Sequence, residues 1–443
     1  MSELLKQGQV VRSASGVPCV IVKFLGGGGQ GEVYKAQWAG RDVAVKWYFD
    51  ASATSEQRAA IMSLVERGAP SDKFLWPLEL LVADSGKGFG YVMPLRRDNF
   101  KSLTDLMAGK VSPSFQSLIT ACYEMTKAFR SLHSAGLCYR DISFGNAFFD
   151  PSNGDVLICD NDNVGVNRAA VAGVLGTPDF MAPEIVRGEE HPSTSSDLHS
   201  LAVLLFYMLF IGHPLQGQAM LKIRAWDRPA RELLFGKKPV FIFDPVDTSN
   251  AAADFDRDES GEAGGNAMVY WRLYPGFLRD TFVKAFTTGL RDPDARVTER
   301  EWQDALARLR NSIFRCQCGT PSFFDPKRLA QQGNAGYCWN KKCGAGLKTP
   351  FQLKLRKEVI MLNADTKLHG HHLENDWDFS KAMAEVVRHP TDPNVWGLKN
   401  LTGGKWVATF PDGAIMDIDS GRSVPLRSGV QVNFGKVEGE IVF

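Results

Sequence analysis

The chain has 443 residues, of which 44% are hydrophobic and 23% charged, and its formal net charge is +1 at pH 7. This length exceeds what a single compact core supports and predicts two to three domains. The composition is that of a globular protein, and the near-neutral charge gives no reason to expect a nucleic acid partner.

The sequence gives no indication of secretion or of membrane insertion. Residues 1–8 lack the apolar core of a signal peptide, and the longest apolar run is residues 201–211. Spanning a bilayer takes about 20 apolar residues, so this run predicts a buried helix. Four of the eight cysteines are scattered and four are clustered between residues 316 and 343. That distribution fits a reducing compartment with one metal site, and we expect a cytoplasmic protein.

The first predicted strands, 10–19 and 20–25, lead into a glycine-rich turn. Gly26, Gly28 and Gly31, with Val33, follow the pattern G-x-G-x-x-G-x-V between apolar segments. Glycines at such a turn let backbone amides approach a phosphate. Four consecutive glycines are equally typical of a loose hairpin, so both interpretations stay open for this segment alone.

The next predicted elements are a strand, a helix, two strands and a long helix. The strand at 42–47 carries Lys46. The helix at 55–67 starts after Thr54 or Ser55 as a cap and stops at a Gly-Ala-Pro sequence. Strands follow at 78–83 and 90–93, and a strongly periodic helix is expected at 115–132.

The most informative stretch is C-Y-R-D-I-S-F-G-N at 138–146, followed by D-N-D at 160–162. Asn146 lies five residues after Asp141, and Asp160 comes within the reach of a short hairpin. A carboxylate that accepts a hydroxyl proton, next to oxygen ligands for a hard cation, suits phosphoryl transfer. The alternative is an Asx-rich loop whose side chains only cap turns.

These motifs, in this order, resemble those of eukaryotic-like (Hanks-type) serine/threonine protein kinases, H-R-D-x-x-x-x-N and D-F-G included. The resemblance extends over about residues 5–312. It includes G-T-P-D-F-M-A-P-E at 176–184, S-D-L-H-S-L at 196–201 and R-D-P-D-A-R at 291–296.

The resemblance implies a bilobal kinase domain that uses ATP and Mg²⁺, with an N-lobe of about 1–94 and a C-lobe of about 95–312. It assigns catalysis to Asp141, contact with the α- and β-phosphates to Lys46, and Mg²⁺ to Asn146 and Asp160. It further implies a salt bridge between Glu184 and Arg296. The remaining nucleotide contacts that it implies are Gly26, Gly28, Gly31 and Val33 over the phosphates and Met93 and Leu95 at the adenine.

The family also requires a glutamate that pairs with Lys46. Glu66 has the usual distance in sequence from the lysine but lies at the end of the predicted helix, and Glu56 lies at its start. Both alternatives stay open.

The sequence departs from the family pattern at three places, which are Tyr139, Ser143 and D-N-D at 160–162 in place of D-F-G. Tyr139 replaces a histidine at a packing position that tolerates an aromatic ring. Ser143 replaces a lysine that contacts the transferred phosphate, which should weaken stabilisation of the transition state and leaves the choice between Ser/Thr and Tyr open. Asn161 replaces the phenylalanine whose packing sets the active state, so the usual switching of that residue should not operate.

The activation segment has no residue that can be phosphorylated at the usual place. Residues 161–176 contain no Ser, Thr or Tyr. We therefore expect a loop that is ordered constitutively or by a partner. Thr177, the nearest hydroxyl, occupies a position that in the family helps to place the substrate.

One segment within the kinase region differs in character from the rest. Residues 244–266 are acidic, rich in Ala and Gly and without periodicity, and predict a mobile insert. Two cysteine pairs then follow, each with a glycine after its second cysteine. Four thiolates in two pairs suit tetrahedral Zn²⁺, and two unrelated pairs of buried cysteines are the alternative. The four candidate zinc ligands are Cys316, Cys318, Cys338 and Cys343.

The C-terminal part predicts short strands at 358–362, 405–410, 414–418, 431–434 and 439–443. Residues 400–443 resemble the last strands of a forkhead-associated domain, although a clear Gly-Arg or Ser-x-x-His motif for phosphothreonine is missing. His369, His371 and His372 favour a polar turn over a metal site. The expected fold is therefore α+β: a kinase domain at 1–312, a zinc ribbon at 313–349 and an all-β domain at 350–443.

The combination resembles bacterial kinases of tellurite-resistance-type systems, which implies a TerY-like protein and a metal-dependent phosphatase as partners. The favoured function is ATP- and Mg²⁺-dependent phosphorylation of a protein hydroxyl, on a substrate or on the chain itself. The alternative is a nucleotide-binding pseudokinase or signalling scaffold whose C-terminal modules recruit partners. Ser143 favours that alternative, whereas Lys46, Asp141, Asn146 and Asp160 together oppose it.

Overall fold

A computed structural model describes the protein over residues 3–83, 88–167, 176–252, 265–356, 358–374, 379, 381–392 and 394–443. The chain divides into two compact units. The first contains Met1–Tyr270 and Thr281–Gln303, and the second contains Trp271–Asp280 and Asp304–Phe443. Within the described ranges, no helix has both the length and the hydropathy that crossing a membrane requires.

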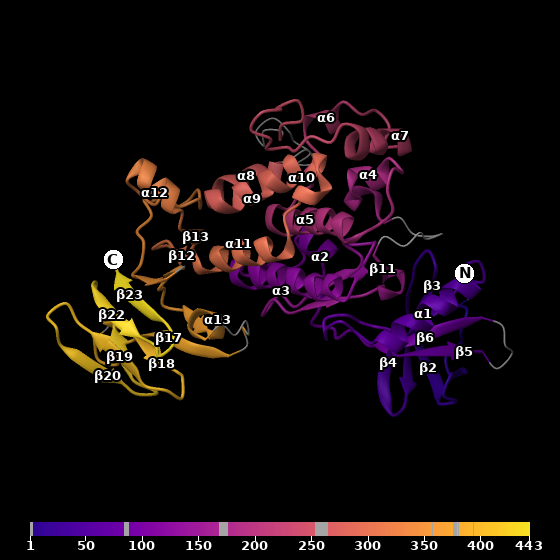
Figure 1. The fold of residues 1–443 in the computed structure, drawn as a ribbon, viewed down its shortest axis with the longest axis horizontal. Coiled ribbons are helices and arrows are strands. Elements are labelled where there is room, and N and C mark those ends of the chain that lie inside the picture. Colours follow the sequence, from indigo (N-terminus) through magenta and orange to yellow (C-terminus); the bar gives the residue numbers. More distant parts are fainter. Residues whose placement is uncertain are drawn as a thin grey trace. The chain divides into compact units, whose positions relative to one another are not determined.

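The first unit begins with six antiparallel strands that close into a barrel in the order β1-β2-β3-β4-β6-β5, drawn in indigo in Figure 1. Their inner faces bury apolar side chains such as Val11, Ile21 and Val45, and the alternation of buried and exposed residues on β1 and β2 follows from the two-residue period of a strand. The strands are β1 (Val10–Ser13), β2 (Pro18–Gly27), β3 (Gly31–Trp38), β4 (Arg41–Tyr48), β5 (Glu79–Val82) and β6 (Phe89–Pro94).

Helix α1 (Ser55–Arg67) has the bounds that its sequence predicts. The Thr54 side chain accepts a hydrogen bond from the backbone N–H of Gln57, and the chain leaves the helix at Gly68 with φ +73°. Thr54 is an N-cap, whose side-chain oxygen accepts a hydrogen bond from an otherwise unpaired backbone N–H. Gly68 ends the helix because glycine tolerates positive φ. The helix buries only Ile61 and Leu64, so most of its surface faces solvent.

The rest of the first unit is mainly helical. Helix α5 is buried along almost its whole length, which confirms that the apolar run at 201–211 is a core helix. The helices of this region are α2 (Leu103–Met107), α3 (Phe115–Ser134), α4 (Pro183–Val186), α5 (Thr194–Phe210), α6 (Gln218–Leu221), α7 (Arg228–Arg231) and α10 (Thr288–Arg291), and a π-helix, η3, covers Glu232–Lys237. Three helices have residues in both units: α8 (Gly265–Leu273), α9 (Gly276–Phe286) and α11 (Glu299–Asn311).

Short strands frame the segment between α3 and α4. Strand β8 (Leu137–Cys138) pairs with β11 (Gly165–Val166), and a three-stranded sheet has the order β10-β9-β7. Its strands are β7 (Lys101–Ser102), β9 (Ala147–Phe149) and β10 (Val156–Ile158), and the 3-10 turns η1 (Asn161–Asn163) and η2 (Pro178–Phe180) lie in the same segment. A third 3-10 turn, η4 (Pro293–Ala295), follows α10. Strands β8 and β9 hold the two ends of the 139–146 loop.

The second unit ends in a sandwich of two antiparallel sheets. One has the order β15-β14-β23-β22-β19-β20 and the other β16-β17-β18-β21. Apolar side chains from both sheets, among them Leu353, Leu398 and Trp406, form one buried core. Its strands are β14 (Gln352–Leu355), β15 (Val359–Met361), β16 (Lys367–His369), β17 (Ala382–Arg388), β18 (Trp396–Asn400), β19 (Trp406–Thr409), β20 (Ile415–Ile418), β21 (Ser423–Pro425), β22 (Val430–Asn433) and β23 (Glu438–Val442).

The five strands predicted in this part match β15, β19, β20, β22 and β23, whereas β14, β16, β17, β18 and β21 were not predicted. The expected polar turn at 369–372 is wrong. His369, His371 and His372 are buried at and within helix α13 (Gly370–Leu373), where the His372 Nε2 atom lies 2.9 Å from Asn311 Oδ1.

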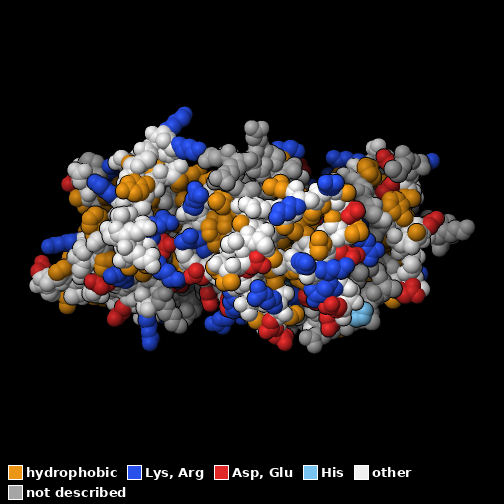
Figure 2. Space-filling view, turned by 90° about the horizontal axis from the view of Figure 1, so that it is seen from above, with side chains coloured by type: hydrophobic (Ala, Val, Ile, Leu, Met, Phe, Trp, Pro, Cys, Tyr) orange, Lys and Arg blue, Asp and Glu red, His pale blue; other side chains and the backbone are white. Residues whose placement is uncertain are grey.

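Two expectations fall partly outside the described residues. Residues 253–264 of the predicted mobile insert are not described, and α8 already begins at Gly265. Residues 168–175 of the activation segment likewise lie outside the residues that the structure describes. On the face drawn in Figure 2, the described side chains of Lys and Arg lie among those of Asp and Glu, in line with the net charge of +1.

Candidate active site

The glycine-rich segment forms the turn between β2 and β3, closed by a hydrogen bond from Gly28 N to Gly31 O of 2.9 Å. A Cβ atom on Gly31 would lie 2.2 Å from the Trp47 carbonyl oxygen, so packing alone requires that glycine. A Cβ atom on Gly26 or Gly28 would meet nothing within 4 Å. Packing therefore requires the glycine at position 31, whereas no packing contact within 4 Å requires the glycines at positions 26 and 28.

Lys46 lies on the outer face of the barrel, directly opposite Val33 on β3 and Tyr91 on β6. Ala44, two residues before it, is opposite Met93. Residues opposite one another in an antiparallel pair project to the same face, so Val33, Lys46 and Met93 share one face. Leu95, the other expected adenine contact, is half-buried just after β6 ends.

The ammonium group of Lys46 is buried between two carboxylates. Its Nζ atom lies 2.8 Å from Asp162 Oδ2 and 3.2 Å from Asp160 Oδ1. Burial by itself would lower the pKa of Lys46, but the charges of Asp162 and Asp160 outweigh it and raise the pKa. Lys46 is therefore a fixed positive charge in the site.

Neither glutamate that the sequence offers pairs with Lys46. Glu56 and Glu66 are exposed on α1, and in the described part of the chain the ion-pair partners of Lys46 are Asp160 and Asp162. Helix α1 reaches this region through Gln57 instead, whose Nε2 atom lies 3.1 Å from the Tyr48 hydroxyl.

Asp141 and Asn146 contact each other within the 139–146 loop. The Asn146 amide donates to Asp141 Oδ2 at 3.0 Å and to the Asp141 carbonyl at 2.8 Å, which closes the loop on itself. The Thr177 hydroxyl donates to Asp141 Oδ1 at 2.8 Å. Both described partners of this carboxylate are neutral donors. Buried Ser143 adds no positive charge where the family has a lysine.

The base of the loop is held by Asp197 at the start of α5. Its carboxylate accepts hydrogen bonds from the backbone N–H groups of Tyr139 and Arg140, the latter at 2.9 Å. His133 Nε2 lies 3.1 Å from the same carboxylate, and His133 Nδ1 contacts Glu299. Burial alone would lower the pKa of His133, but its hydrogen bonds to Asp197 and Glu299 raise it to about 9. A charged imidazolium thus bridges two carboxylates below the loop.

Tyr139 is a packing residue, as its aromatic character predicts. It is fully buried, with its ring edge-on to Phe129 at a centroid distance of 5.5 Å. Its hydroxyl donates to the carbonyl oxygen of Cys159, immediately before Asp160. The tyrosine therefore ties the two halves of the site together.

Asp160 is the partly solvent-exposed carboxylate of the D-N-D sequence. It has left-handed backbone angles, φ 54° and ψ 42°, and its side chain is 39% exposed, whereas that of Asp162 is 0% exposed. Burial raises its pKa, Lys46 opposes the rise, and Asp162 and Asp141 add to it. Such a surplus of negative charge is what a bound cation would neutralise. The intervening Asn161 is buried and donates to the Ile158 carbonyl at 3.0 Å, so it is not free to swing out.

The described start of the activation segment is tied to the catalytic loop without phosphate. Strand β11 pairs with β8, and the Arg140 guanidinium covers Gly165, where a Cβ atom would lie 2.0 Å from it. Arg140 Nη2 also donates to the Val166 carbonyl at 3.4 Å. The arginine thus contacts backbone of this segment directly.

The expected salt bridge between Glu184 and Arg296 is present and buried. Arg296 Nη1 and Nη2 donate to Glu184 Oε1 and Oε2 at 2.8 and 2.7 Å, a bidentate pair. Arg296 Nε also donates to the Gly289 carbonyl at 3.1 Å. This pair fixes α4 to the region around α10.

A pocket of about 800 Å³ adjoins the segment that follows Thr177. Its apolar lining includes Pro178, Met181 and Phe235, and its polar lining includes Arg231 and Glu232. The pocket therefore combines apolar contact with charges of both signs.

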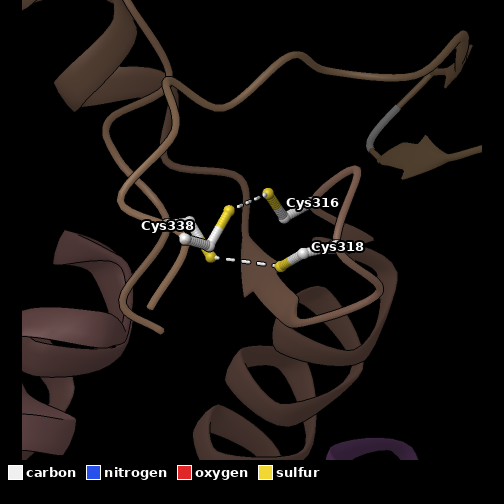
Figure 3. A group of neighbouring side chains, drawn as sticks. Cys316, Cys318 and Cys338 are labelled. Atoms are coloured by element: carbon white, nitrogen blue, oxygen red, sulfur yellow. Dashed lines mark hydrogen bonds between the residues drawn. The ribbon is translucent and has the colours of Figure 1, made fainter. Parts of the chain in front are cut away.

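The four clustered cysteines also come together, in the second unit. Their sulfur atoms all lie within 4.8 Å of one another, with Cys316–Cys343 at 3.8 Å and Cys318–Cys338 at 3.7 Å. Figure 3 shows Cys316 and Cys318 pointing toward Cys338. Disulfides are excluded because an S–S bond is about 2.05 Å long. A tetrahedral zinc with Zn–S bonds of about 2.3 Å places its sulfurs about 3.8 Å apart, so the geometry fits zinc.

The backbone around these cysteines forms two tight turns. Gly319 and Gly344, each directly after a second cysteine, have φ of +84° and +56°. Gly319 N donates to the Cys316 carbonyl at 2.8 Å, and Cys343 N donates to the Asn340 carbonyl at 2.8 Å. Glycine is favoured at both places because other residues rarely adopt positive φ.

Sequence reasoning missed Asp162, Gln57 and the contact of Thr177 with Asp141. The D-x-D spacing at 160–162 was visible, but it does not reveal which carboxylate faces the lysine. The position of Gln57 in the first turn of α1 could have predicted its role, because a side chain there can reach β4.

Comparison with known proteins agrees with this geometry. Residues 19–234 match the family model described as protein kinase domain. A protein of Dictyostelium discoideum named as a probable serine/threonine-protein kinase is 29% identical over 199 residues, which is 42% of this chain and 11% of that protein. A serine/threonine-protein kinase/receptor of Acanthamoeba polyphaga mimivirus is 27% identical over 210 residues, 44% of this chain and 12% of the relative.

The protein kinase C delta type of Rattus norvegicus is 36% identical over 98 residues, 21% of this chain and 14% of that protein. The chain thus covers 11% to 14% of the length of these three relatives. Over residues 19–234 the chain is therefore similar to protein kinase domains, whose fold is bilobal and α+β, and the first two relatives are named as serine/threonine-protein kinases.

Proposed function

We propose that this chain, which carries a protein kinase domain, transfers the γ-phosphate of ATP to Ser or Thr hydroxyls of a protein substrate or of itself. The observation that carries the proposal is the arrangement of Asp141, bonded to Asn146 and Thr177, alongside the open carboxylate Asp160 paired with buried Lys46. Asp141 orients the attacking hydroxyl and accepts its proton. Lys46 holds the α- and β-phosphates as a fixed cation.

Asn146 and Asp160 would hold Mg²⁺, whose charge neutralises the phosphate oxygens. The raised pKa of Asp160 and its exposure support this assignment, since the same surplus charge is costly without a cation. Asp162 is unsuited to the role because its side chain is fully buried. Gly26 and Gly28, with open space where a Cβ would be, would cover the phosphates.

A protein substrate is supported by the pocket next to Thr177. The cavity of about 800 Å³ has both apolar and charged lining. A polypeptide substrate whose hydroxyl lies at Asp141 would place neighbouring side chains in this cavity. Arg140, which already contacts Gly165 and the Val166 carbonyl, supports activity without a phosphate on residues 161–176.

We further propose that Cys316, Cys318, Cys338 and Cys343 bind one structural Zn²⁺. Sulfur separations of 3.7 and 3.8 Å support tetrahedral coordination, and four protein ligands leave no open position for catalysis. Buried Phe314 and Met361, on either side of the cysteine segment, share one apolar cluster with Cys316 and Cys338. A zinc ribbon at 313–349 would therefore support the β-rich domain at 350–443 that follows it.

The two-sheet sandwich supports the likeness of the C-terminal domain to forkhead-associated domains. A TerY-like protein and a metal-dependent phosphatase are the partners that the resemblance implies, and a cytoplasmic location fits the free cysteines. The kinase domain of 1–312 would be the catalytic part of such an assembly.

The rival function is a nucleotide-binding scaffold without phosphoryl transfer. The observation that favours it is Ser143, because neither described partner of the Asp141 carboxylate carries the positive charge that the family supplies there. Retention of Lys46, Asp141, Asn146 and Asp160 in one site favours the kinase.

The deciding experiment measures transfer of labelled phosphate from ATP with Mg²⁺ to the chain itself and to a generic basic protein. Wild type is compared with Asp141→Ala and with Asp72→Ala, a control aspartate whose side chain is 86% exposed. Incorporation lost only in Asp141→Ala supports the kinase. No incorporation in any protein, with nucleotide still bound, supports the scaffold.

A further inference from the structure

Lys46 and Asp162 form a buried ion pair from two different parts of the first unit. Lys46 Nζ lies 2.8 Å from Asp162 Oδ2 and 3.0 Å from Oδ1. The two side chains are 5% and 0% exposed. A buried ammonium is stable only with a close counter-charge, and a fully buried carboxylate needs one equally.

The second hydrogen-bond partner of Asp162 lies on the same strand as the lysine. The Tyr48 hydroxyl donates to Asp162 Oδ2 at 2.5 Å. Tyr48 follows Lys46 by two residues on β4, so both project to the same face of the strand. Asp162 is thereby engaged on both oxygens by β4, which leaves Asp160 as the carboxylate available to other ligands.

Helix α1 contributes a neutral group to this network. Gln57 Nε2 lies 3.1 Å from the Tyr48 hydroxyl and 3.4 Å from the Asp162 carbonyl oxygen. The glutamates of the helix, Glu56 and Glu66, are exposed. The helix therefore touches the lysine site through an uncharged amide.

We propose that Asp162 is the residue that positions Lys46, in place of a glutamate on α1. In protein kinases generally, the lysine pairs with a glutamate of this helix, and movement of the helix controls activity through that pair. Here the counter-charge comes from the loop that also holds Asp160. Displacing α1 would break neutral hydrogen bonds and leave the buried ion pair intact.

This arrangement matches the composition of the activation segment. Residues 161–176 offer no hydroxyl for a phosphate that would move α1, and the lysine does not depend on such a movement. The inference rests on the proposed function only in calling Lys46 a nucleotide ligand. The ion pair itself can be tested without phosphoryl transfer.

The first test measures the rate at which acetic anhydride acetylates Lys46 at one fixed pH, read by peptide mass spectrometry. In Asp162→Asn the ammonium keeps only the partly exposed Asp160 carboxylate at 3.2 Å, so Lys46 is held less firmly and we expect it to be acetylated about tenfold faster. Glu56→Gln and Glu66→Gln are the matched controls and should leave the rate as in wild type. An unchanged rate in folded Asp162→Asn, or an effect of either glutamate variant as large as the expected one, overturns the proposal.

The second test measures the affinity for a fluorescent ATP analogue together with phosphoryl transfer. We expect Asp162→Asn to lower kcat about tenfold or more with a smaller change in nucleotide affinity, and Asp162→Glu to recover part of the loss. Circular dichroism establishes that each variant is folded. If Asp162→Asn does not fold, Glu56→Gln and Glu66→Gln still test the proposal. A loss of ATP binding in either variant would place the counter-charge of Lys46 on α1.

The two tests separate this inference from the proposed function. Suppose that wild type transfers no phosphate but that Asp162→Asn changes the acetylation rate of Lys46. That result would overturn the kinase proposal and support the ion-pair proposal. If wild type transfers phosphate and Asp162→Asn changes neither the acetylation rate nor phosphoryl transfer, the kinase proposal stands and the ion-pair proposal is overturned.

Discussion

The Thr177 hydroxyl donates a 2.8 Å hydrogen bond to Oδ1 of Asp141, from a segment 36 residues further along the chain. The other carboxylate oxygen, Oδ2, accepts from the Asn146 amide at 3.0 Å. The carboxylate is thus held from both sides in one orientation. The segment that begins at Thr177 also continues into the pocket proposed for the substrate.

Removing that hydroxyl should reduce catalysis more than nucleotide binding. For Thr177→Val we expect kcat to fall roughly 10- to 100-fold, because Asp141 loses one of the donors that orient it. Steady-state phosphoryl transfer checks this value. Thr177→Ser keeps the hydroxyl and should stay within about threefold of wild type; equal losses in both variants would argue against the hydrogen bond.

The glycines of the β2–β3 turn should respond differently to the same substitution. Gly31→Ala forces a Cβ atom to 2.2 Å from the Trp47 carbonyl and should destabilise the fold by several kcal/mol. Gly28→Ala meets nothing within 4 Å, so the protein should fold normally while its affinity for ATP falls. Thermal unfolding and ATP titration of both variants provide the check. Normal ATP affinity in Gly28→Ala would remove that glycine from the nucleotide site.

Breaking the Glu184–Arg296 pair should destabilise the protein strongly. Both side chains are at least 90% buried, and Arg296→Met leaves the Glu184 carboxylate buried without its partner. Losses of this kind are about 3–5 kcal/mol. Lys284→Gln, which removes an exposed ion pair with Glu301, is the control and should change stability by less than about 1 kcal/mol. Urea unfolding of the two variants measures the difference.

The stability of the first unit should decline on the alkaline side of neutrality. The pKa of His133 is raised from 6.5 to about 9, so its contribution is complete below the unfolded value and is lost as the pH rises through the folded value. We expect a loss of up to about 3 kcal/mol between about pH 6 and about pH 10.

Urea midpoints across that range check the decline, with His133→Asn as the comparison. The variant should be less stable than wild type near pH 6 and approach it near pH 10, because the imidazolium then no longer contributes. A constant difference between the two proteins would show that His133 acts only through packing.

The four-cysteine cluster should contain one zinc ion per chain. Elemental analysis of purified protein is expected to give about one equivalent of zinc, and Cys338→Ser should reduce it to near zero. Cys19→Ser, which alters a buried cysteine in the first unit, should retain the metal. Chelation should lower the unfolding temperature of the second unit, since a structural zinc contributes to folding. Zinc retained in Cys338→Ser would point to a different set of ligands.

Local patterns in the sequence were sufficient to predict several elements and sites. The bounds of α1, the pairing of Glu184 with Arg296 and the meeting of the four cysteines agree with prediction. The bounds of α1 follow from its caps, which are interactions over a few residues. The Glu184–Arg296 pair, 112 residues apart, was predicted because both residues lie in motifs that resemble those of a known family.

Tertiary structure decided which charges meet. Asp160 and Asp162 are two residues apart and chemically identical, yet only Asp162 is buried against Lys46, because the left-handed backbone at Asp160 turns the chain into η1. In the same way, the histidines at 369–372 are buried by packing in the second unit, where sequence polarity predicted an exposed turn. Which of two neighbouring carboxylates is buried against the lysine, and which polar side chains are covered, depends on the packed fold, and no local pattern encodes it.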